Sequence, residues 1–192
     1  MKVWKDDEGR VVIGVFKIDN EKVIIGSVYA PNIDASVRSQ QRYSRFILDL
    51  EALLGEAKRH AQSFILCGDF NLYCDPYLDT EESNIMPHPY PICKDNFLDF
   101  LTNTNAADLL RTTHRRKRLS SFSPSGENRR GIARRLDYLL CSPDLIHDLN
   151  KNALFWGPLS DHKYLIAENS EKTTAKTGPG IWRHNDSHLN NN

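Results

Sequence analysis

Three short strings place an acid or a histidine where a strand is expected to end: residues 68–71 (GDFN), 135–138 (RLDY) and 160–162 (SDH). Carboxylates and imidazole are the usual groups of general acid and base catalysis. Each string alone also has a structural interpretation, because Asp69 can cap a turn, Asp137 can pair with Arg135, and residues 160–162 can form an exposed loop. The three strings together favour one shared site.

The elements that must position these side chains follow from hydrophobic periodicity. Residues 11–18 and 23–29 are β-branched runs separated by a turn-forming tetrapeptide, which predicts an antiparallel hairpin in a buried sheet. Residues 37–60 carry apolar side chains at helical spacing, with Asp34 or Ser36 as the N-cap, and predict an amphipathic helix over the sheet. Residues 63–67 predict a strand that runs directly into Asp69.

The second half of the chain is less regular. Residues 72–91 have no period and predict a surface loop, and residues 95–101 resume a helical pattern. The remaining expected elements are strands at residues 120–123 and 135–141 around a loop at 124–132, a short helix at 143–149, and strands at 153–156 and 164–167. This mixture predicts an α/β protein.

Composition narrows the class of protein. The 192 residues are 40% hydrophobic and 26% charged, which is typical of one soluble domain. The sequence contains no run of ~18 apolar residues, so a membrane span is not expected. The N-terminus lacks a signal peptide, so we expect an intracellular protein without a membrane partner. Four cysteines form no CxxC pair and are expected to be reduced, with Cys67 and Cys141 buried as small hydrophobic residues.

Charge is distributed unevenly. The chain as a whole has a net charge of zero, but residues 111–135 hold nine Arg or Lys and one acid, Glu127, giving 9 − 1 = +8 there and −8 elsewhere. This segment is a candidate for binding phosphate, and the alternative is a solvated charged loop.

Four strings, YAPN (residues 29–32), GDFN, RLDYLLCS (135–142) and SDH, occur in the order that is used by the endonuclease/exonuclease/phosphatase family. The resemblance covers about residues 5–168 and implies an α/β sandwich of the deoxyribonuclease I-like type. Residues 6–10 (DDEGR) and 178–189 (GPGIWRHNDSHL) resemble segments of retroelement polyproteins. The chain therefore resembles most closely the apurinic-type endonuclease domain of LINE-type, non-long-terminal-repeat retrotransposons. Residues 169–192 would then be a polar linker before a reverse transcriptase.

The resemblance implies a DNA-nicking enzyme and assigns its parts. Asp69 would orient or deprotonate the attacking water, Asn71 would bind the water or the phosphate, and Asp137 would hold the His162 imidazole in its cationic form. Tyr29 would donate to the phosphate, although its alternative is an aromatic packed in the core. The catalytic set is thus Asp69, Asn71, His162, Asp137 and Tyr29.

Substrate contacts and a metal site are implied in the same way. Asn32 would support the phosphate, Ser121 would bond a DNA phosphate, and Arg129 and Arg130 would sit on a loop that probes the minor groove. The full set of expected DNA contacts is Asn32, Ser121, Arg129, Arg130, Arg134 and Arg135.

The cofactor would be Mg²⁺ or Mn²⁺, with Asp161 as a ligand. In the family, the principal glutamate ligand and the first strands precede the segment that corresponds to Met1. We therefore expect an N-terminally truncated domain with weak metal binding, in which residues 11–18 lack their outer partner strands and expose an apolar edge.

Two other functions remain open. One is a repair-type apurinic endonuclease or a phosphoesterase, against which the basic loop and residues 178–189 argue. The other is a catalytically inactive relic that binds nucleic acid, which the missing glutamate favours. If the element is active, the expected location is the nucleus.

Overall fold

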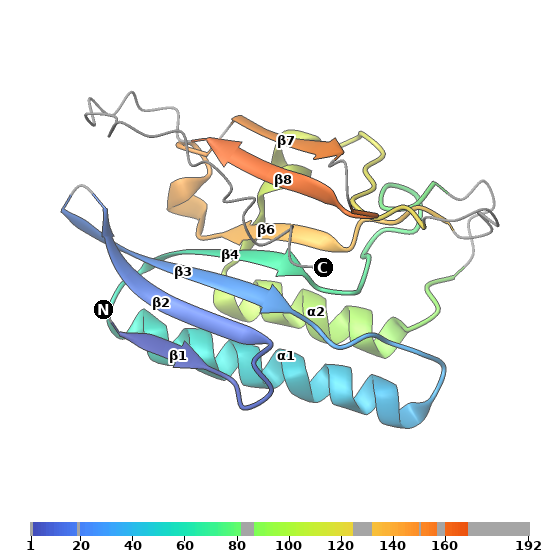
Figure 1. Cartoon of the computed structure of the whole chain (residues 1–192), viewed down its shortest axis with the longest axis horizontal. Helices are drawn as coiled ribbons and strands as arrows, with labels where there is room; N and C mark the ends of the chain where they lie inside the picture. The colour runs from blue at the N-terminus through green and yellow to red at the C-terminus, as the bar shows by residue number, and fades with distance from the viewer. Residues whose placement is uncertain are drawn as a thin grey trace, which may run out of the picture.

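Most of the molecule is built on one mixed sheet, with strands in the order β1-β2-β3-β4-β6-β5 (Figure 1). The computed structural model describes residues 2–18, 20–81, 87–124, 132–149, 151–156 and 160–168. Only β3 and β4 are parallel, and every other neighbouring pair in the sheet is antiparallel. The strands are β1 (Val3–Lys5), β2 (Val11–Ile18), β3 (Glu21–Tyr29), β4 (Ser63–Asp69), β5 (Ala107–Asp108) and β6 (Asp137–Cys141).

The predicted hairpin of β2 and β3 is confirmed, with register from Val11↔Val28 to Ile18↔Glu21. The other edge of β2 pairs with β1, so the prediction that residues 11–18 lack an outer partner is wrong. The three-residue β1 pairs with residues 12–14 of this edge, and its sequence was too short to show a period. The outer face of β2 nevertheless exposes apolar side chains, namely Val12, Phe16 and Ile18.

Helices α1 (Val37–Lys58) and α2 (Pro91–Thr104) cover one face of the sheet (Figure 1). Ser36, one of the two expected caps, accepts a hydrogen bond from the Ser39 amide and begins α1. The α2 helix is longer than the predicted 95–101 because it begins at a proline and ends at left-handed Asn105. None of the helices in the described ranges has the length and apolar character needed to cross a bilayer.

A glycine lets β3 and β4 come together just before the site. Gly68 has φ of +145°, and a Cβ there would lie 1.9 Å from the Val28 carbonyl oxygen, so no other residue fits without a backbone shift. The register then pairs Tyr29 with Asp69 and Asp69 with Asp137. These three residues form one row across β3, β4 and β6.

A separate two-stranded sheet is formed by β7 (Lys151–Trp156) and β8 (Lys163–Glu168). Both strands are slightly longer than predicted. The expected strand at 120–123 is only a pair of isolated bridges, from Phe122 to Arg134 and to His162. The expected helix at 143–149 is reduced to a 3₁₀ turn at Pro143–Leu145, and the short helix α3 (Leu109–Thr113) was not predicted. The predicted linker, residues 169–192, lies outside the described residues.

All four cysteines are free, as expected, but one of the two burial predictions is wrong. Cys141 is buried, whereas Cys67 is exposed. Side chains alternate along β4, so Phe64 and Leu66 face the core while Cys67 faces the opposite side.

Candidate active site

One cleft of about 430 Å³ lies beyond the ends of β3 and β4, and predicted site residues line it. Tyr29 ends β3, Asp69 ends β4, and His162 immediately precedes β8. Side chains from distant parts of the chain therefore meet at one place. The predicted residues that line the cleft are Tyr29, Asn32, Asp69, Asn71, Arg134 and His162.

Asp69 is a partly buried carboxylate with a raised pKa. Burial is the main cause and raises the pKa to about 6, while the charges of Asp137 and Asp161 act in the same direction. The hydrogen bond from the Asn71 amide, 2.8 Å long, and the charge of His162 oppose the increase. A carboxyl poised near neutral pH suits a general base.

Asn71 has φ of +50°, and its backbone amide donates to the Asp69 Oδ1, so Asp69 forms the turn that its structural interpretation suggested. Its side-chain amide donates to the Ala30 carbonyl oxygen at 2.7 Å. The amide NH₂ therefore ties the turn after β4 to the end of β3. This local role does not remove Asn71 from the cleft that it lines.

His162 and Asp137 form a hydrogen-bonded pair, with Nδ1 2.8 Å from the Asp137 Oδ2. Burial alone would lower the pKa of His162, but the bond and the charge of Asp137 outweigh it and raise the pKa above its usual value. Asp69 and Asp161 add to this increase. The pair therefore favours an imidazolium whose other ring nitrogen, Nε2, is available to the cleft.

Tyr29 is 55% exposed, so the alternative of an aromatic packed in the core is wrong. The Arg10 guanidinium lies over its ring, 5.7 Å from the ring centre. Arg10 is also held by Glu8 at 2.8 Å, and Glu8 in turn bonds Arg42. The phenol is thus presented at the cleft beside fixed positive charge.

Asp161 lies close enough to Asp69 and His162 for its charge to raise the pKa of both groups. Within the described residues, however, no group of three or more His, Cys, Asp or Glu side chains is arranged to hold a metal ion. Asp137 is already engaged by His162. Among the described residues, these carboxylates therefore form no three-ligand metal site.

Ser121 does not contact DNA as predicted, because it is fully buried. Its Oγ accepts hydrogen bonds from the amides of Leu136 and Asp137, both 2.9 Å long, and its carbonyl oxygen accepts from the Lys163 amide at 2.6 Å. Asp137 belongs to the pair with His162, and Lys163 follows His162 in the chain. Ser121 therefore ties together the two backbone segments that carry the pair.

Arg135 is also buried, so the prediction that it contacts the DNA backbone is wrong. It does not pair with Asp137 either. Its guanidinium bonds Asp79 at 2.8 Å and Asp108 at 2.6 Å, and Asp79 further bonds Arg111. This network could not be predicted from the sequence, because its members are far apart along the chain and Asp79 lies in an aperiodic loop.

Arg134 does line the cleft, with its guanidinium 5.5 Å from the centre of the Tyr73 ring. Its Nε is buried and, among the described residues, has no hydrogen-bond partner. The orphaned donor suits an oxygen-rich ligand such as phosphate. The other two expected DNA contacts, Arg129 and Arg130, lie outside the described residues.

Part of the cleft wall was missed by sequence reasoning. His88 bonds the Tyr73 carbonyl oxygen at 2.8 Å and the Tyr90 amide at 3.0 Å, and burial lowers its pKa. It is therefore a neutral histidine that fastens the loop, and a single His in an aperiodic segment gave no signal. The cleft residues that were not predicted are Ile33, Leu72, Tyr73, His88, Tyr90, Phe122 and Leu136.

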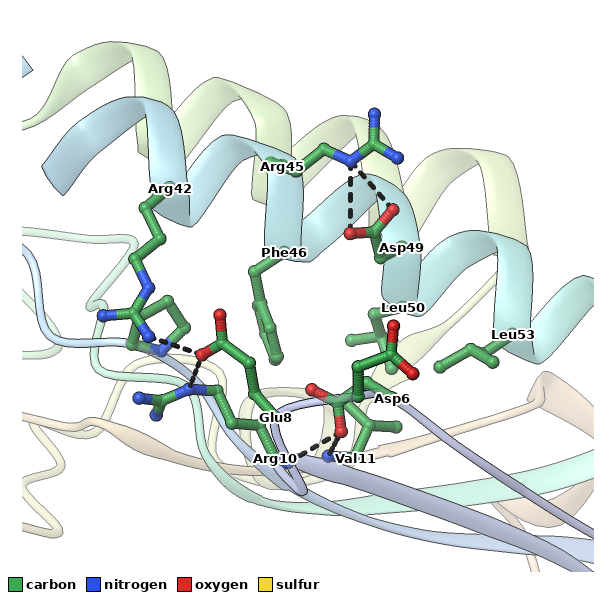
Figure 2. A pocket seen from close by; sticks show the side chains of 12 residues that line it. Asp6, Glu8, Arg10, Val11, Arg42, Arg45, Phe46, Asp49, Leu50 and Leu53 are labelled. Carbon is green, nitrogen blue, oxygen red and sulfur yellow. Dashed lines mark hydrogen bonds and ion pairs between the residues drawn. The ribbon is translucent and has the colours of Figure 1, made fainter. Parts of the chain in front are cut away.

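A second depression, of about 260 Å³, lies between α1 and the turn from β1 to β2 (Figure 2). Asp6 closes this turn by accepting from the amides of Arg10 and Val11, at 2.7 and 2.8 Å. Its three arginines are all ion-paired, Arg45 with Asp49 and both Arg10 and Arg42 with Glu8 (Figure 2). Because these arginines already have acidic partners, this depression is not the candidate site.

Comparison with solved structures supports the fold. The chain is 18% identical to the 3′ phosphatase NExo from Neisseria, with a TM-score of 0.68, over 86% of this chain and 66% of that one. It is 22% identical to an AP endonuclease from Archaeoglobus fulgidus, with a TM-score of 0.69, over 88% of this chain and 70% of that one. It is 22% identical to the AP endonuclease LMAP from Leishmania major, with a TM-score of 0.71, over 86% of this chain and 56% of that one.

The chain thus spans about two thirds or less of the length of two of these proteins. No curated protein matches it in sequence. The model of the Endonuclease/Exonuclease/phosphatase family matches residues 2–162. The mixed α/β fold is that of the deoxyribonuclease I-like neighbours, and the chain belongs to the endonuclease/exonuclease/phosphatase family.

Proposed function

We propose that this chain hydrolyses phosphodiester bonds of DNA and acts as an endonuclease that nicks one strand. The observation that carries the proposal is the meeting of Asp69 with the Asp137–His162 pair at one cleft. Family membership agrees with a hydrolase of phosphodiester bonds. The Neisseria neighbour was solved with a product DNA hairpin, which is consistent with DNA as the substrate.

The residues of the cleft divide the reaction among them. Asp69 takes a proton from the attacking water, which adds to phosphorus as the bond to the leaving oxygen breaks. The His162 imidazolium and the Tyr29 phenol donate hydrogen bonds to phosphate oxygens as negative charge grows there. The Arg134 guanidinium, at the cleft wall, offsets the negative charge of the phosphate.

A long polyanion fits the surroundings better than a small phosphate ester. A groove of about 700 Å³ shares Tyr29 and Asn32 with the cleft, so the two depressions adjoin each other. Its charged lining residues are Arg10, Arg38 and Arg42 together with Glu8 and Asp34, and Glu8 pairs with Arg10 and Arg42. Arg38 has no ion-pair partner among the described residues and would meet a phosphate beside the reacting one.

Within this function, we propose a LINE-type retrotransposon endonuclease linked to a reverse transcriptase. The support is sequence similarity at residues 6–10 and 178–189. The second of these segments lies outside the described residues. A repair-type apurinic endonuclease or 3′ phosphatase is the alternative, favoured by the activities of the structural neighbours. A second alternative is an inactive relic that only binds nucleic acid.

Enzymes of this family generally use divalent metals. Mg²⁺ or Mn²⁺ with Asp161 as a ligand remains a prediction, because the described residues form no three-ligand group. No step proposed for this chain's own residues runs through a metal.

The test is nicking of supercoiled plasmid by the full chain, with Mg²⁺ or Mn²⁺ and with EDTA. The variants are Asp69→Asn and His162→Ala, and the matched control is His147→Ala, whose side chain is 93% exposed. We expect nicking that falls at least about a hundredfold in the two site variants and is unchanged in the control.

Equal nicking by all four proteins would point to a contaminating nuclease and would overturn the proposal. Binding of DNA without nicking would favour the inactive relic. Cleavage confined to abasic or 3′-phosphate substrates would favour the repair-type enzyme.

A further inference from the structure

A cationic surface that the proposed active site does not use follows helix α3. It consists of residues 114–118 (His114, Arg115, Arg116, Lys117 and Arg118), called the basic turn below. All but His114 are exposed. Within the described ranges, Arg115, Arg116 and Lys117 form no ion pair, so their charge is not neutralised locally.

The backbone of the basic turn is fixed from inside the molecule. One nitrogen of Arg111 donates to the carbonyl oxygens of His114 and Lys117, at 3.2 and 2.9 Å. The other nitrogen bonds buried Asp79. The turn is therefore pre-organised by contacts to its carbonyl groups, and its cationic side chains are not needed for this.

A hollow of about 270 Å³ lies between the basic turn and the β7–β8 hairpin. His114, Lys117 and Arg118 line it from the turn, and Lys163 lines it from β8. Its acid, Glu81, accepts a hydrogen bond from Ser120 at 2.6 Å. Burial lowers the pKa of Lys163, the charge of Lys117 lowers it further, and Glu81 opposes this. Positive charge therefore dominates the hollow.

The hollow and the active-site cleft are separated by two neighbouring backbone segments. Ser120 and Lys163 line the hollow, whereas Phe122 and His162 line the cleft. The two segments are joined by the Phe122↔His162 bridge. In Figure 1 the yellow segment after α3 reaches the end of the hairpin where β8 begins. The two depressions are thus adjacent.

We propose that the basic turn is a second nucleic-acid contact, which binds phosphates of the DNA duplex that flank the one in the cleft. Duplex DNA carries one charge per ≈ 1.7 Å of axis, so a duplex seated in the cleft carries further phosphates past the neighbouring hollow. Exposed guanidinium and ammonium groups bind such phosphates without reading sequence. The inference rests on the proposed function, because continuity with the cleft favours DNA over an acidic protein.

The test compares two triple variants that remove equal charge. Arg115→Ala/Arg116→Ala/Lys117→Ala removes the exposed cations of the basic turn and spares Arg118, which stacks on Tyr77. The control, Lys17→Ala/Lys22→Ala/Arg59→Ala, lies at the β2–β3 turn and at the end of α1, away from the cleft (Figure 1). Affinity for a 20-base-pair duplex is measured against salt, together with hydrolysis of bis-p-nitrophenyl phosphate and thermal unfolding.

In the basic-turn variant, we expect the affinity for the duplex at low salt to fall at least about tenfold. The slope of log affinity against log salt concentration should be smaller in magnitude by about 2 to 3. Its small-ester hydrolysis and unfolding temperature should match the control. Equal affinity and slope in both variants would overturn the proposal. So would a loss of binding to polyglutamate with duplex affinity retained, since that would indicate an acidic protein partner. Failure of small-ester hydrolysis in the unaltered chain would count against the proposed function only, because duplex binding is measured independently.

Discussion

At the scale of single residues, the charge state of the cleft depends on a few carboxylates around one imidazole. Asp137 bonds His162 at 2.8 Å and raises its pKa, while burial raises the pKa of Asp69 to about 6. The proposed activity needs Asp69 deprotonated and His162 protonated. It should therefore rise with pH through about 6 and fall as pH passes the raised pKa of His162.

Replacing Asp137→Asn should move mainly the alkaline side of this profile. The neutral amide keeps the size of the side chain but removes the charge that raises the pKa of His162, so imidazolium is lost at lower pH. We expect at least roughly a tenfold loss in kcat/KM at pH 8 and a smaller loss near pH 6. The acid limb should move slightly to lower pH, because the charge of Asp137 also raises the pKa of Asp69. An unshifted alkaline limb in the measured kcat/KM profile would show that Asp137 does not set the charge of His162.

Replacing Ser121→Ala should act on the pair from a distance. It leaves the amides of Leu136 and Asp137 without their acceptor, at a cost of about 1–3 kcal/mol for each buried group. We expect a lower free energy of unfolding and a lower kcat, with KM and the salt slope of DNA binding unchanged. Ser121→Thr, which keeps the hydroxyl, should restore kcat. A reduced salt slope at full stability would instead support a direct phosphate contact.

At the scale of elements, a buried ion network holds the loop after β4 against β5, α3 and the segment before β6. Asp79 is fully buried and accepts from Arg135, Arg111 and the amides of Cys74 and Asp75. Burial would raise its pKa, but Arg135, the backbone hydrogen bonds and Arg111 outweigh this and lower it. Arg135 directly precedes the segment that leads to Asp137, so the network also locates the site.

Replacing Asp79→Ala should destabilise the fold by about 3–5 kcal/mol, because buried Arg135 keeps only Asp108 as a partner and Arg111 loses its carboxylate. The folded-state pKa of Asp79 is lowered, so its stabilisation is complete above its ordinary pKa and lost only as pH falls through the lower value. The difference should therefore be constant from pH 8 to pH 5 in urea titrations. Asp49→Ala, which removes an exposed partner of Arg45, should cost less than about 1 kcal/mol. Equal costs for the two variants would contradict a structural role for the network.

At the scale of the whole molecule, apolar side chains remain exposed on both sheets. On the large sheet they are Val12, Phe16 and Ile18, and on the β7–β8 hairpin they are Phe155, Tyr164 and Ile166. The chain spans only 66% of the Neisseria neighbour's length. Exposed apolar surface of this kind favours association.

Replacing Val12→Thr together with Ile18→Thr should reduce self-association, since threonine keeps the preference for strands and adds a hydroxyl. We expect light scattering at a fixed protein concentration to fall by roughly half, with an unchanged unfolding temperature. The control, Leu48→Gln with Ile92→Gln, changes two exposed apolar residues on the helices. If the control lowers scattering equally, the face of β2 has no special part in association.

The sequence by itself determined the local elements and the composition of the site. The hairpin of β2 and β3, helix α1 with its Ser36 cap, and strand β4 ending at Asp69 follow from side-chain period and capping chemistry, which act over a few residues. The order of the strings at residues 29–32, 68–71, 135–142 and 160–162 indicated the family.

Only the tertiary structure decided which polar side chains face the cleft and which are buried. Arg135 lies within a string that resembles the family's motifs and Ser121 was assigned by the same resemblance, yet both are buried and hold carboxylates and backbone in place. His88 has no motif at all and lies on the cleft wall. Burial and pairing depend on contacts between segments tens of residues apart, so neither period nor spacing along the chain can reveal them.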